Sequence, residues 1–423
     1  MGNHQEIDSA LVPYRILDLT EGGGMIGARI LGDLGADVIK IESPGGSPSR
    51  IAPYYKDIPH PEKSLFWFAY NTNKRGITLD ISKVDGQEIF KRLVKSADVV
   101  MESFEPGYMN QLGLGYTDLS KIKPDLIMTS ITPFGQSGPK AHYKGSDLTA
   151  WASGGYLYIC GDPDRPPVWI SFPHAALHAG AEAAAGTMTA LWHRRKTGGD
   201  GQQVDVSMQE CVIACNFNTP EMWDLNKVDF TRFSKGLHVG TQGVRVNAVW
   251  ECKDGHTVLI CQGGVQPFIN SMNELVNWMA SEGMAEDWLK EMDWEKDYDA
   301  SKLTQDAVDR VENAVQRFLI TKTKKELYQE GALKRRILIG PINTTKDIWE
   351  DSQLHSRDFW VPVKHPELGV TVAYPGPFIK LSESQIKYRR RAPLIGEHNI
   401  EVYENELGLS REDLAVLKRD MII

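Results

Sequence analysis

Residues 15–42, RILDLTEGGGMIGARILGDLGADVIKIE, contain the alternation of elements that decides the fold. The apolar run at 16–19 predicts a strand, the glycines at 22–24 predict a turn, and a helix follows to Leu34. Residues 37–41 predict the next strand. A strand, a helix and a second strand in this order are typical of a parallel sheet, because the helix returns the chain to the edge where it started.

The same alternation continues through the first half of the chain. Further strands are predicted at 76–79, 97–101, 126–131 and 203–206, with helices between most of them. A polar turn at 71–75 precedes the first of these strands. The sequence therefore predicts an α/β fold with a mostly parallel sheet, and its ligands are expected at the strand ends.

A long helix rich in small residues is predicted over 174–192. Its small side chains suit close packing, and the exposed N–H groups of its first turn should attract negative charge. That turn offers Ala175, Ala176 and Leu177 and no carboxylate. An earlier helix opens at Ser146 and Asp147, where either residue is a suitable cap.

The second half of the chain changes character. Residues 223–243 are polar and irregular, a hairpin follows at 248–252 and 256–261, and helices rich in Trp and charged residues fill 266–331. A return segment then leads to a final helix. We expect a smaller α+β domain at 221–335, inserted between a domain part at 1–220 and a segment at 336–423.

Length and composition limit the possible functions. The chain has 423 residues, and two domains are expected for this length. Its net charge is -9 with acids and bases interspersed, which argues against binding nucleic acid or an anionic membrane. No signal peptide or membrane-spanning run is predicted. The five cysteines indicate reduced thiols in the cytoplasm, and Cys211 and Cys215 are assigned to packing rather than to a metal site.

Three glycines formally match a nucleotide-binding pattern. Gly22, Gly24 and Gly27 satisfy the dinucleotide fingerprint, and Glu42 stands where an acid could bind a ribose. The pattern by itself is weak, because any turn from strand to helix in an open α/β sheet benefits from glycines. An NAD-dependent oxidoreductase therefore stays open as an outside alternative.

Several motifs together resemble the class III CoA-transferases, the family of formyl-CoA transferase, carnitine CoA-transferase and 2-methylacyl-CoA racemase. The similarity spans about residues 15–420. The motifs are LDLT (17–20), LGDLGADVIKIESPGG (31–46), NTNKRGITLD (71–80), ADVVMESFEPG (97–107), LGLGYTDLSKIKPDLIMTSITPFGQSGP (112–139), RRKTGGDGQQVDVSMQE (194–210), ILIGPINT (337–344), DFWVPVKHPELG (358–369) and RAPLIGEHN (391–399).

The resemblance implies a large Rossmann-like domain made from both chain ends, a small middle domain, and two interlocked subunits. It also implies that coenzyme A and acyl-CoA are substrates, with no permanently bound cofactor. The chemistry of this family uses an aspartate that attacks the acyl-CoA thioester to form an anhydride. That position falls on Ala176 here, and no Asp or Glu lies between Arg165 and Gly180. The racemase pair is missing too, since Ser146 stands at the place of its histidine.

The resemblance also implies binding residues. Two arginines that contact CoA in the family are replaced by Ser43 and Gln111, and each loss removes a charge-assisted contact of roughly 1.5–3 kcal/mol. A glycine loop that reaches the partner's site should include Gly240, Gln242 and Gly243. The residues implied for CoA binding are Lys74 and Arg75 beside the phosphates, Phe104 near the adenine, and Lys144.

The favoured hypothesis is a non-nucleophilic subunit of a heteromeric CoA-transferase, whose paralogous partner carries the aspartate. Among heteromeric members, the chain resembles succinyl-CoA:(R)-benzylsuccinate CoA-transferase of anaerobic toluene degradation, and the resemblance is compatible with an aromatic acid as the substrate. One alternative is a homodimeric transferase that uses Asp147 or Glu182 as the acyl carrier. A further alternative is a family member that binds CoA or an acid without turnover.

Overall fold

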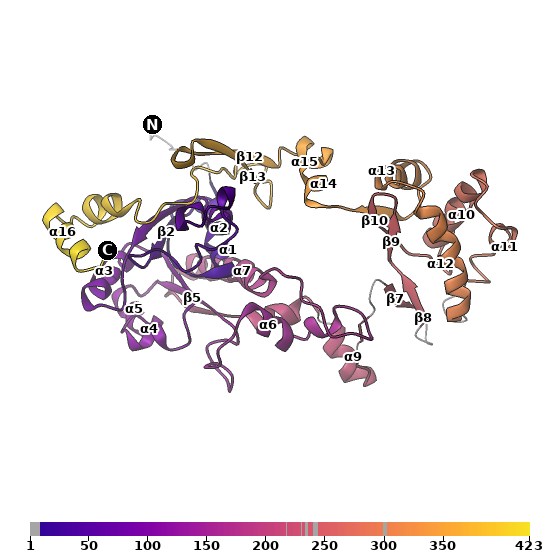
Figure 1. The fold of residues 1–423 in the computed structure, drawn as a ribbon. Coiled ribbons are helices and arrows are strands. Elements are labelled where there is room, and N and C mark those ends of the chain that lie inside the picture. The colour runs from indigo at the N-terminus through magenta and orange to yellow at the C-terminus, as the bar shows by residue number, and fades with distance from the viewer. Residues whose placement is uncertain (1–8, 217, 230, 233–235, 240–243, 299–302) are drawn as a thin grey trace. The chain divides into compact units, whose positions relative to one another are not determined.

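The structure is a computed structural model that describes residues 9–216, 218–229, 231–232, 236–239, 244–298 and 303–423 (Figure 1). The chain divides into two compact units. The first contains Met1–Tyr156, Trp169–Glu221 and Leu354–Ile423, and the second contains Leu157–Val168 and Met222–Gln353.

The boundary between the units differs from the one expected at 335/336. Strand β11 (Ile339–Ile342) pairs antiparallel with β10 (Gly255–Leu259), with Gly340 opposite Val258. This pairing keeps the segment up to Gln353 in the second unit. The segment lacked a distinct pattern in the sequence because a four-residue edge strand carries little periodicity.

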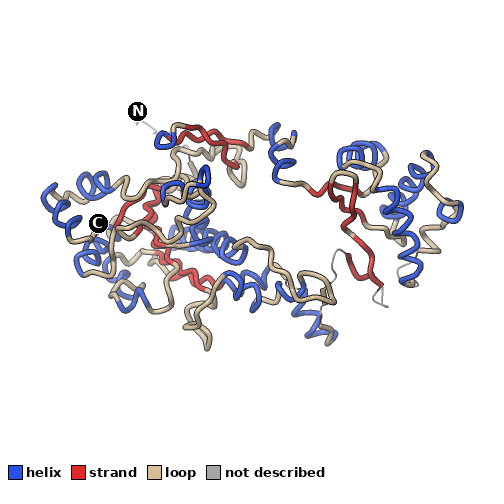
Figure 2. Tube along the Cα trace, viewed as in Figure 1, coloured by secondary structure: helices blue, strands red, loops and turns tan. Residues whose placement is uncertain are grey.

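A six-stranded sheet with only parallel pairs is the centre of the first unit. The strand order is β3-β2-β1-β4-β5-β6, the order of doubly wound nucleotide-binding folds. This confirms the α/β prediction (Figure 2). The strands are β1 (Arg15–Leu19), β2 (Asp37–Glu42), β3 (Lys74–Thr78), β4 (Val99–Glu102), β5 (Ile127–Thr132) and β6 (Gln203–Ser207).

Strand β3 begins earlier than the sequence indicated. Lys74 and Arg75, expected in a polar turn, are its first two residues and pair with Val38 and Ile39 of β2. All five residues of β3 are buried. Strands buried in a parallel sheet are usually apolar, so two cations at the start of β3 are unusual. They can be buried there because acidic side chains from distant segments pair with them.

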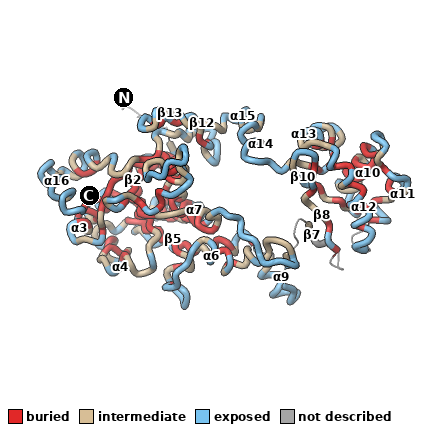
Figure 3. Tube along the Cα trace, viewed as in Figure 1, coloured by how far each residue is buried: buried red, intermediate tan, exposed pale blue. Residues whose placement is uncertain are grey.

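The two faces of the sheet are covered by different helices. On one face, α1 (Met25–Asp33) and α7 (His174–Thr197) pack Ala28, Ala179 and Ala183 against the strands. On the other face, α3 (Val84–Val94), α5 (Tyr116–Ile122) and the C-terminal segments complete a second core. Figure 3 shows the strands of the sheet buried between these layers.

Short elements complete the first unit. The hairpin of β12 and β13 shares a small core with α2, in which Trp67 and Tyr374 are buried. The remaining bounds are η1 (Gly22–Gly24), η2 (Tyr55–Asp57), η3 (Pro61–Lys63), α2 (Leu65–Tyr70), α4 (Tyr108–Gln111), α6 (Asp147–Ser153), α8 (Met208–Ala214), β12 (Trp360–His365), η6 (Pro366–Leu368), β13 (Val370–Pro375), η7 (Ile400–Glu406) and α16 (Arg411–Arg419).

The second unit has its own core, built on an antiparallel sheet of order β11-β10-β9 and the helices beside it. Trp250 and Trp278 are among its buried residues. Its bounds are η4 (Leu157–Ile159), β7 (Gly236–Val239), β8 (Val244–Asn247), β9 (Val249–Cys252), α10 (Gln266–Ser281), α11 (Asp287–Lys290), α12 (Gln305–Leu319), α13 (Lys324–Glu326), η5 (Leu327–Lys334) and α14 (Thr345–Trp349). Two helices lie where the units divide, α9 (Asn218–Asn226) and α15 (Ser352–Ser356).

Among the described residues, no helix combines the length and the hydrophobicity that crossing a bilayer requires.

Candidate functional site

The start of α7 is held by a carboxylate from another helix. Asp147, the first residue of α6, accepts a hydrogen bond from the backbone N–H of Ala176 through Oδ1 at 2.9 Å. Burial raises the pKa of Asp147, and hydrogen bonds from the Ala176 and Ala175 amides oppose that rise. The carboxylate therefore serves as the N-terminal cap of α7, which lacks a cap from its own Pro173.

The glycine turn η1 packs directly on the same helix start. A Cβ added at Gly23 would lie 2.6 Å from the Ala176 Cβ, and one added at Gly27 would lie 2.6 Å from the Gly180 carbonyl oxygen. These glycines are required because backbone meets backbone there, which a side chain would prevent. The helix α7 thus lies against the turn that the dinucleotide pattern had suggested for a pyrophosphate.

Glu42 is also engaged within the protein. Both of its carboxylate oxygens accept from the Arg50 guanidinium, at 2.7 and 2.8 Å, and Oε2 also accepts from the Ser47 amide. Glu42 is 2% exposed. Both carboxylate oxygens of Glu42 are thus occupied by Arg50 and Ser47 in this structure, and a role as a ribose acceptor stays a prediction.

A buried cluster of charged side chains lies next to Met25, the residue that follows η1. Lys74 Nζ donates to Asp18 Oδ2 at 2.7 Å, to the Met25 carbonyl and to Asn71 Oδ1, and Lys40 Nζ lies 4.0 Å from Asp18 Oδ1. Burial lowers the pKa of Lys74 to about 8, although Asp18 opposes the shift. Lys74, expected beside CoA phosphates, has all three of its donors satisfied inside the protein.

Arg75 is held in the same way. Its guanidinium pairs with Asp37 at 2.6 Å, with Glu401 at 2.9 Å and with Glu406 at 2.5 Å. The side chain is 6% exposed. The family resemblance implies that Arg75 binds a CoA phosphate. In this structure the positive charge of Arg75 is instead compensated by these three carboxylates.

A pocket opens at the carboxyl ends of β1 and β2, and we call it the strand-end pocket. Phe104 and Tyr108 line it with ring centroids 4.9 Å apart, so Phe104 does lie at a strand end where ligands gather. Among the described residues that line it, none is Lys or Arg. The lining is Leu19, Glu21, Ile41, Glu42, Ser43, Pro48, Leu79, Asp80, Ile81, Ser82, Phe104 and Tyr108.

The other expected site residues do not converge with these. Lys144 lies in the exposed loop before α6, and Gln111 is exposed at the end of α4. Glu182 is exposed on α7, two turns after Asp147's contact with that helix. Gly240, Gln242 and Gly243 lie outside the described residues, so their place in a partner's site stays a prediction.

Cys215 and His178 form a contact that resembles a catalytic pair in composition only. The thiol sulfur lies 3.5 Å from Nδ1 and 3.4 Å from Nε2. The two ring nitrogens direct their lone pairs or protons in divergent directions, so an atom equidistant from both lies against the ring and not along a hydrogen bond. Burial also raises the pKa of the Cys215 thiol, which disfavours a thiolate nucleophile.

Two features of the first unit were not found from the sequence. Glu102 ends β4 with 3% exposure, and burial raises its pKa to about 7, although a hydrogen bond from the Phe104 amide opposes the rise. A second pocket lies between α6, α7 and α8 and contains Trp151 and His174. No motif signals either one, since each depends on segments that are distant in the chain.

The described residues contain no group of three or more His, Cys, Asp or Glu side chains placed to hold a metal ion.

The chain was compared with known protein families and with known proteins. The sequence pattern of CoA-transferase family III matches residues 11–399. The BbsE subunit of succinyl-CoA:(R)-benzylsuccinate CoA-transferase from Thauera aromatica is 34% identical over 391 residues, which cover 92% of each chain. Formyl-CoA:oxalate CoA-transferase of Streptomyces coelicolor is 32% identical and covers 98% of this chain and 99% of its own.

Another relative is also described as a subunit, the beta subunit of succinyl-CoA–L-malate CoA-transferase from Chloroflexus aurantiacus. It is 30% identical and covers 94% of this chain and 93% of its own. Among solved structures, a CAIB/BAIF family protein from Brucella suis superposes with a TM-score of 0.79 at 26% identity, covering 94% of this chain and 99% of that one.

Proposed function

The chain belongs to CoA-transferase family III, and from this membership we propose that it is the non-nucleophilic subunit of a heteromeric CoA-transferase. The complex would move CoA from an acyl-CoA donor, such as succinyl-CoA, to a carboxylic acid. The nucleophilic aspartate would come from a paralogous partner, interlocked with this chain in the cytoplasm.

One observation carries this proposal: the start of α7 has no carboxylate of its own. Ala175 and Ala176 occupy its second and third positions, and the Ala176 methyl group faces Gly23. An alanine cannot form an acyl anhydride, so in this proposal a second chain supplies the reactive oxygen.

The relatives are consistent with a shared reaction. BbsE and the malate CoA-transferase beta subunit are each named as one subunit of a transferase whose donor is succinyl-CoA. An aromatic acid such as benzylsuccinate is the acceptor that the BbsE relative suggests. The formyl-CoA:oxalate relatives share the family and suggest a different donor and acceptor.

The strand-end pocket supports a reduced role for CoA in this subunit. Its described lining contains Glu21 and Asp80 and no cation, and Ser43 stands where CoA-binding members carry an arginine. A polyphosphate in this pocket would lack charge-assisted contacts. Lys144 is the exposed cation that we retain as a CoA contact.

Production of the chain alone and together with its paralogue tests the proposal. We expect transferase activity with succinyl-CoA only when both chains are present. In the complex, hydroxylamine trapping and peptide mass spectrometry should find the acyl adduct on the partner. An adduct on this chain, or full activity of this chain alone, would contradict the proposal.

Asp147 is the competing acyl carrier, because it lies close to the start of α7. Its Oδ1 already accepts the Ala176 amide, so attack on a thioester through this oxygen would release the helix cap. The isosteric variant Asp147→Asn separates the two functions. Activity of the complex retained in Asp147→Asn supports the partner's aspartate, whereas its complete loss with an intact fold supports a homodimeric transferase that uses Asp147. A chain that stays inactive with every paralogue supports a binding role without turnover.

A further inference from the structure

A small polar pocket lies over β4 and β5, on the face of the sheet that is turned away from α7. We call it the Glu102 pocket, and its cavity volume is about 80 Å³. Thr129 Oγ1 lies 2.7 Å from Thr187 Oγ1 of α7, so the next side chain of β5, that of Ser130, points to the opposite face. The side chains that line the pocket include Glu102, Glu105, Tyr116, Ser130, Gln136 and Gln203.

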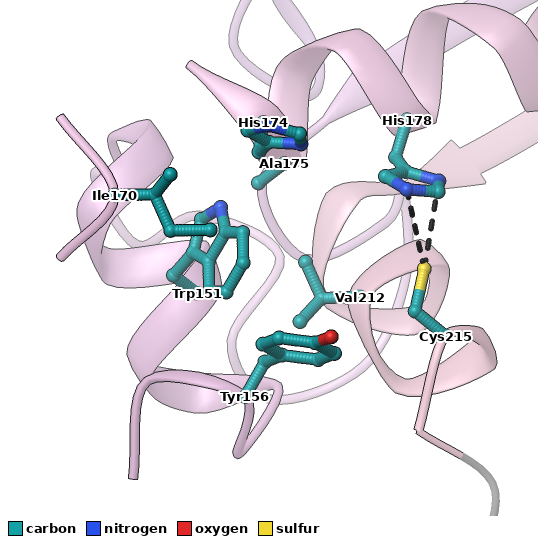
Figure 4. Close-up of a pocket in the computed structure, with 8 residues that line it drawn as sticks. All are labelled: Trp151, Tyr156, Ile170, His174, Ala175, His178, Val212 and Cys215. Carbon is teal, nitrogen blue, oxygen red and sulfur yellow. Dashed lines mark hydrogen bonds between the residues drawn. The ribbon is translucent and has the colours of Figure 1, made fainter. Parts of the chain in front are cut away.

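The Glu102 pocket is separate from the two pockets described above. It shares no lining residue with the strand-end pocket. The pocket at the start of α7, shown in Figure 4, is lined by His174, Ala175 and His178 of that helix and lies on the α7 side of the sheet. A ligand of the Glu102 pocket would therefore occupy neither of them.

Glu102 is a buried acid without a counter-ion. It is 3% exposed, and it forms no ion pair with any described residue. The other buried acids of the first unit each have a basic partner within 3.3 Å. These pairs are Asp18–Lys74, Asp33–Arg29 and Glu42–Arg50. Because acidic side chains are rarely buried without a partner, Glu102 lacks a positive charge of the kind that the rest of the unit supplies.

The surroundings of Glu102 favour a positive charge. Glu105 lines the same pocket, and none of the described residues that line it is a Lys, Arg or His. Burial raises the pKa of Glu102 to about 7, and the negative charge of Asp205 adds to the rise. The pocket therefore has a negative potential, which attracts either a proton or another cation.

A buried hydroxyl beside Glu102 also lacks a partner. Ser130 is opposite Glu102 in the register of β4 and β5. It is 1% exposed, and its Oγ is buried without a hydrogen bond. Oε2 of Glu102 accepts the Phe104 amide at 2.7 Å. A buried polar atom is normally paired, so the Ser130 hydroxyl at this pocket wall indicates a ligand that is absent.

We propose that the Glu102 pocket binds a small monovalent cation of the size of K⁺ or NH₄⁺. The Glu102 carboxylate and the Ser130 hydroxyl oxygen hold the cation, and the side chains of Gln136 and Gln203 line the same space. Uncharged oxygen atoms of this kind can replace the hydration shell of K⁺. One buried carboxylate balances one positive charge, whereas Ca²⁺ sites combine several carboxylates. The site needs neither CoA nor a partner chain, so it does not depend on the proposed function.

Thermal unfolding of the purified full-length chain in KCl, NH₄Cl or choline chloride, at equal ionic strength, tests this site. Choline is too large for the cavity and serves as the reference cation. At pH 8 we expect K⁺ or NH₄⁺ to raise the Tm by about 2–4 °C, the shift for a ligand at about five times its dissociation constant. At pH 5.5 a proton on Glu102 competes with the cation, so the shift should largely disappear.

The two active salts distinguish the two cations, since a rise with only one of them assigns the site to that ion. Equal Tm values in KCl, NH₄Cl and choline chloride would show a pocket that holds water only and would overturn the proposal. A larger rise in MgCl₂ than in KCl or NH₄Cl would overturn the monovalent assignment.

Three variants locate the effect. Glu102→Gln keeps the size of the side chain and removes the charge, so it should abolish the shift. Glu383→Gln, at an exposed position, is the matched control and should keep it. Ser130→Ala removes the hydroxyl and should weaken cation binding about tenfold, as for a lost contact to a charged group.

Ser130→Ala also protects the test against a misfolded Glu102→Gln, because it deletes an oxygen that forms no hydrogen bond in the protein. A cation-dependent shift that is unchanged in Ser130→Ala, or in a folded Glu102→Gln, would overturn the proposal. Full transferase activity of this chain alone would contradict the proposed function and leave the cation result unaffected.

Discussion

The carboxylate of Asp147 accepts the backbone N–H of Ala176 at 2.9 Å, and this bond joins the starts of two helices. Asp147 is the first residue of α6 and Ala176 is the third residue of α7. One negative charge thus lies at two positive helix ends. The start of α7, which has no acidic residue in its own first turn, is thus capped by a carboxylate from α6.

Removal of this cap should lower the stability of the first unit. We expect Asp147→Ala to reduce the free energy of unfolding by about 0.5–2 kcal/mol, the usual cost of losing an N-terminal cap. Asp147→Asn keeps an acceptor oxygen and should lose much less. Urea unfolding followed by far-UV circular dichroism measures both. Equal losses in the two variants would show that the negative charge, and not the hydrogen bond, holds the helix start.

The close contact between η1 and α7 should not tolerate a methyl group. In Gly23→Ala the new Cβ would lie 2.6 Å from the Ala176 Cβ and 2.9 Å from its carbonyl carbon. Overpacking of this kind costs about 1–3 kcal/mol. Gly45→Ala is the control, because nothing lies within 4 Å of its added Cβ. Thermal unfolding should show a lower Tm for Gly23→Ala alone, and a Tm equal to that of Gly45→Ala would contradict the observed packing.

Lys74 should act on stability rather than on CoA binding. Lys74→Met leaves the buried Asp18 carboxylate with Lys40 at 4.0 Å as its remaining cation. Breaking a buried pair by removing one partner costs about 3–5 kcal/mol. Lys144→Met, in an exposed loop, should leave the unfolding free energy unchanged and weaken CoA binding by the complex. Denaturant unfolding measures stability, and calorimetry measures CoA binding. If Lys74→Met weakened CoA binding and left the unfolding free energy unchanged, while Lys144→Met did the opposite, Lys74 would be a phosphate ligand.

Glu102 should make stability depend on pH. Its folded pKa is about 7 against a reference value of 4.5, because burial favours the neutral form. Between these values the folded state holds a proton that the unfolded state has lost, so stability falls as pH rises from 4.5 to 7. The unfolding free energy lost over this pH range is about 3 kcal/mol, at roughly 1.4 kcal/mol per pKa unit.

The variant Glu102→Gln removes this titration. The unfolding free energy of the unmodified chain, relative to Glu102→Gln, should decrease by up to that amount between pH 4.5 and pH 8. The exposed neighbour Glu105→Gln is the control and should show the pH profile of the unmodified chain. A Glu102→Gln profile parallel to that of the unmodified chain would show that the carboxyl ionises at its ordinary pKa.

A cation returned to the strand-end pocket should strengthen its binding of CoA. Ser43 is exposed and lines this pocket. In Ser43→Arg we expect CoA to bind about tenfold more tightly or better, since a charge-assisted contact contributes about 1.5–3 kcal/mol. Ser120→Arg adds the same charge outside the pocket and serves as the control in isothermal titration calorimetry. An equal gain in both variants would indicate a general charge effect and no CoA site in this pocket.

Local patterns predicted the strands and helices of the first unit well. Apolar runs marked β1, β2, β4, β5 and β6 to within two residues, and the small residues of α7 predicted its close packing. Strand β3 was placed late, because Lys74 and Arg75 have the polarity of a turn. Their partners Asp18 and Glu401 lie 56 and 326 residues away, which no local window includes.

The sequence by itself determined the parallel α/β core and the absence of an acidic residue from the first turn of α7, because hydrophobic periodicity and residue identity are properties of neighbouring positions. The tertiary structure decided how the polar residues are used. It placed Lys74 and Glu42 in buried pairs, made the glycines of η1 a contact with α7, and left the Trp151 Nε1–H without a partner. Burial and hydrogen bonding depend on which distant segments the fold brings together, and that choice is made only when the chain is packed.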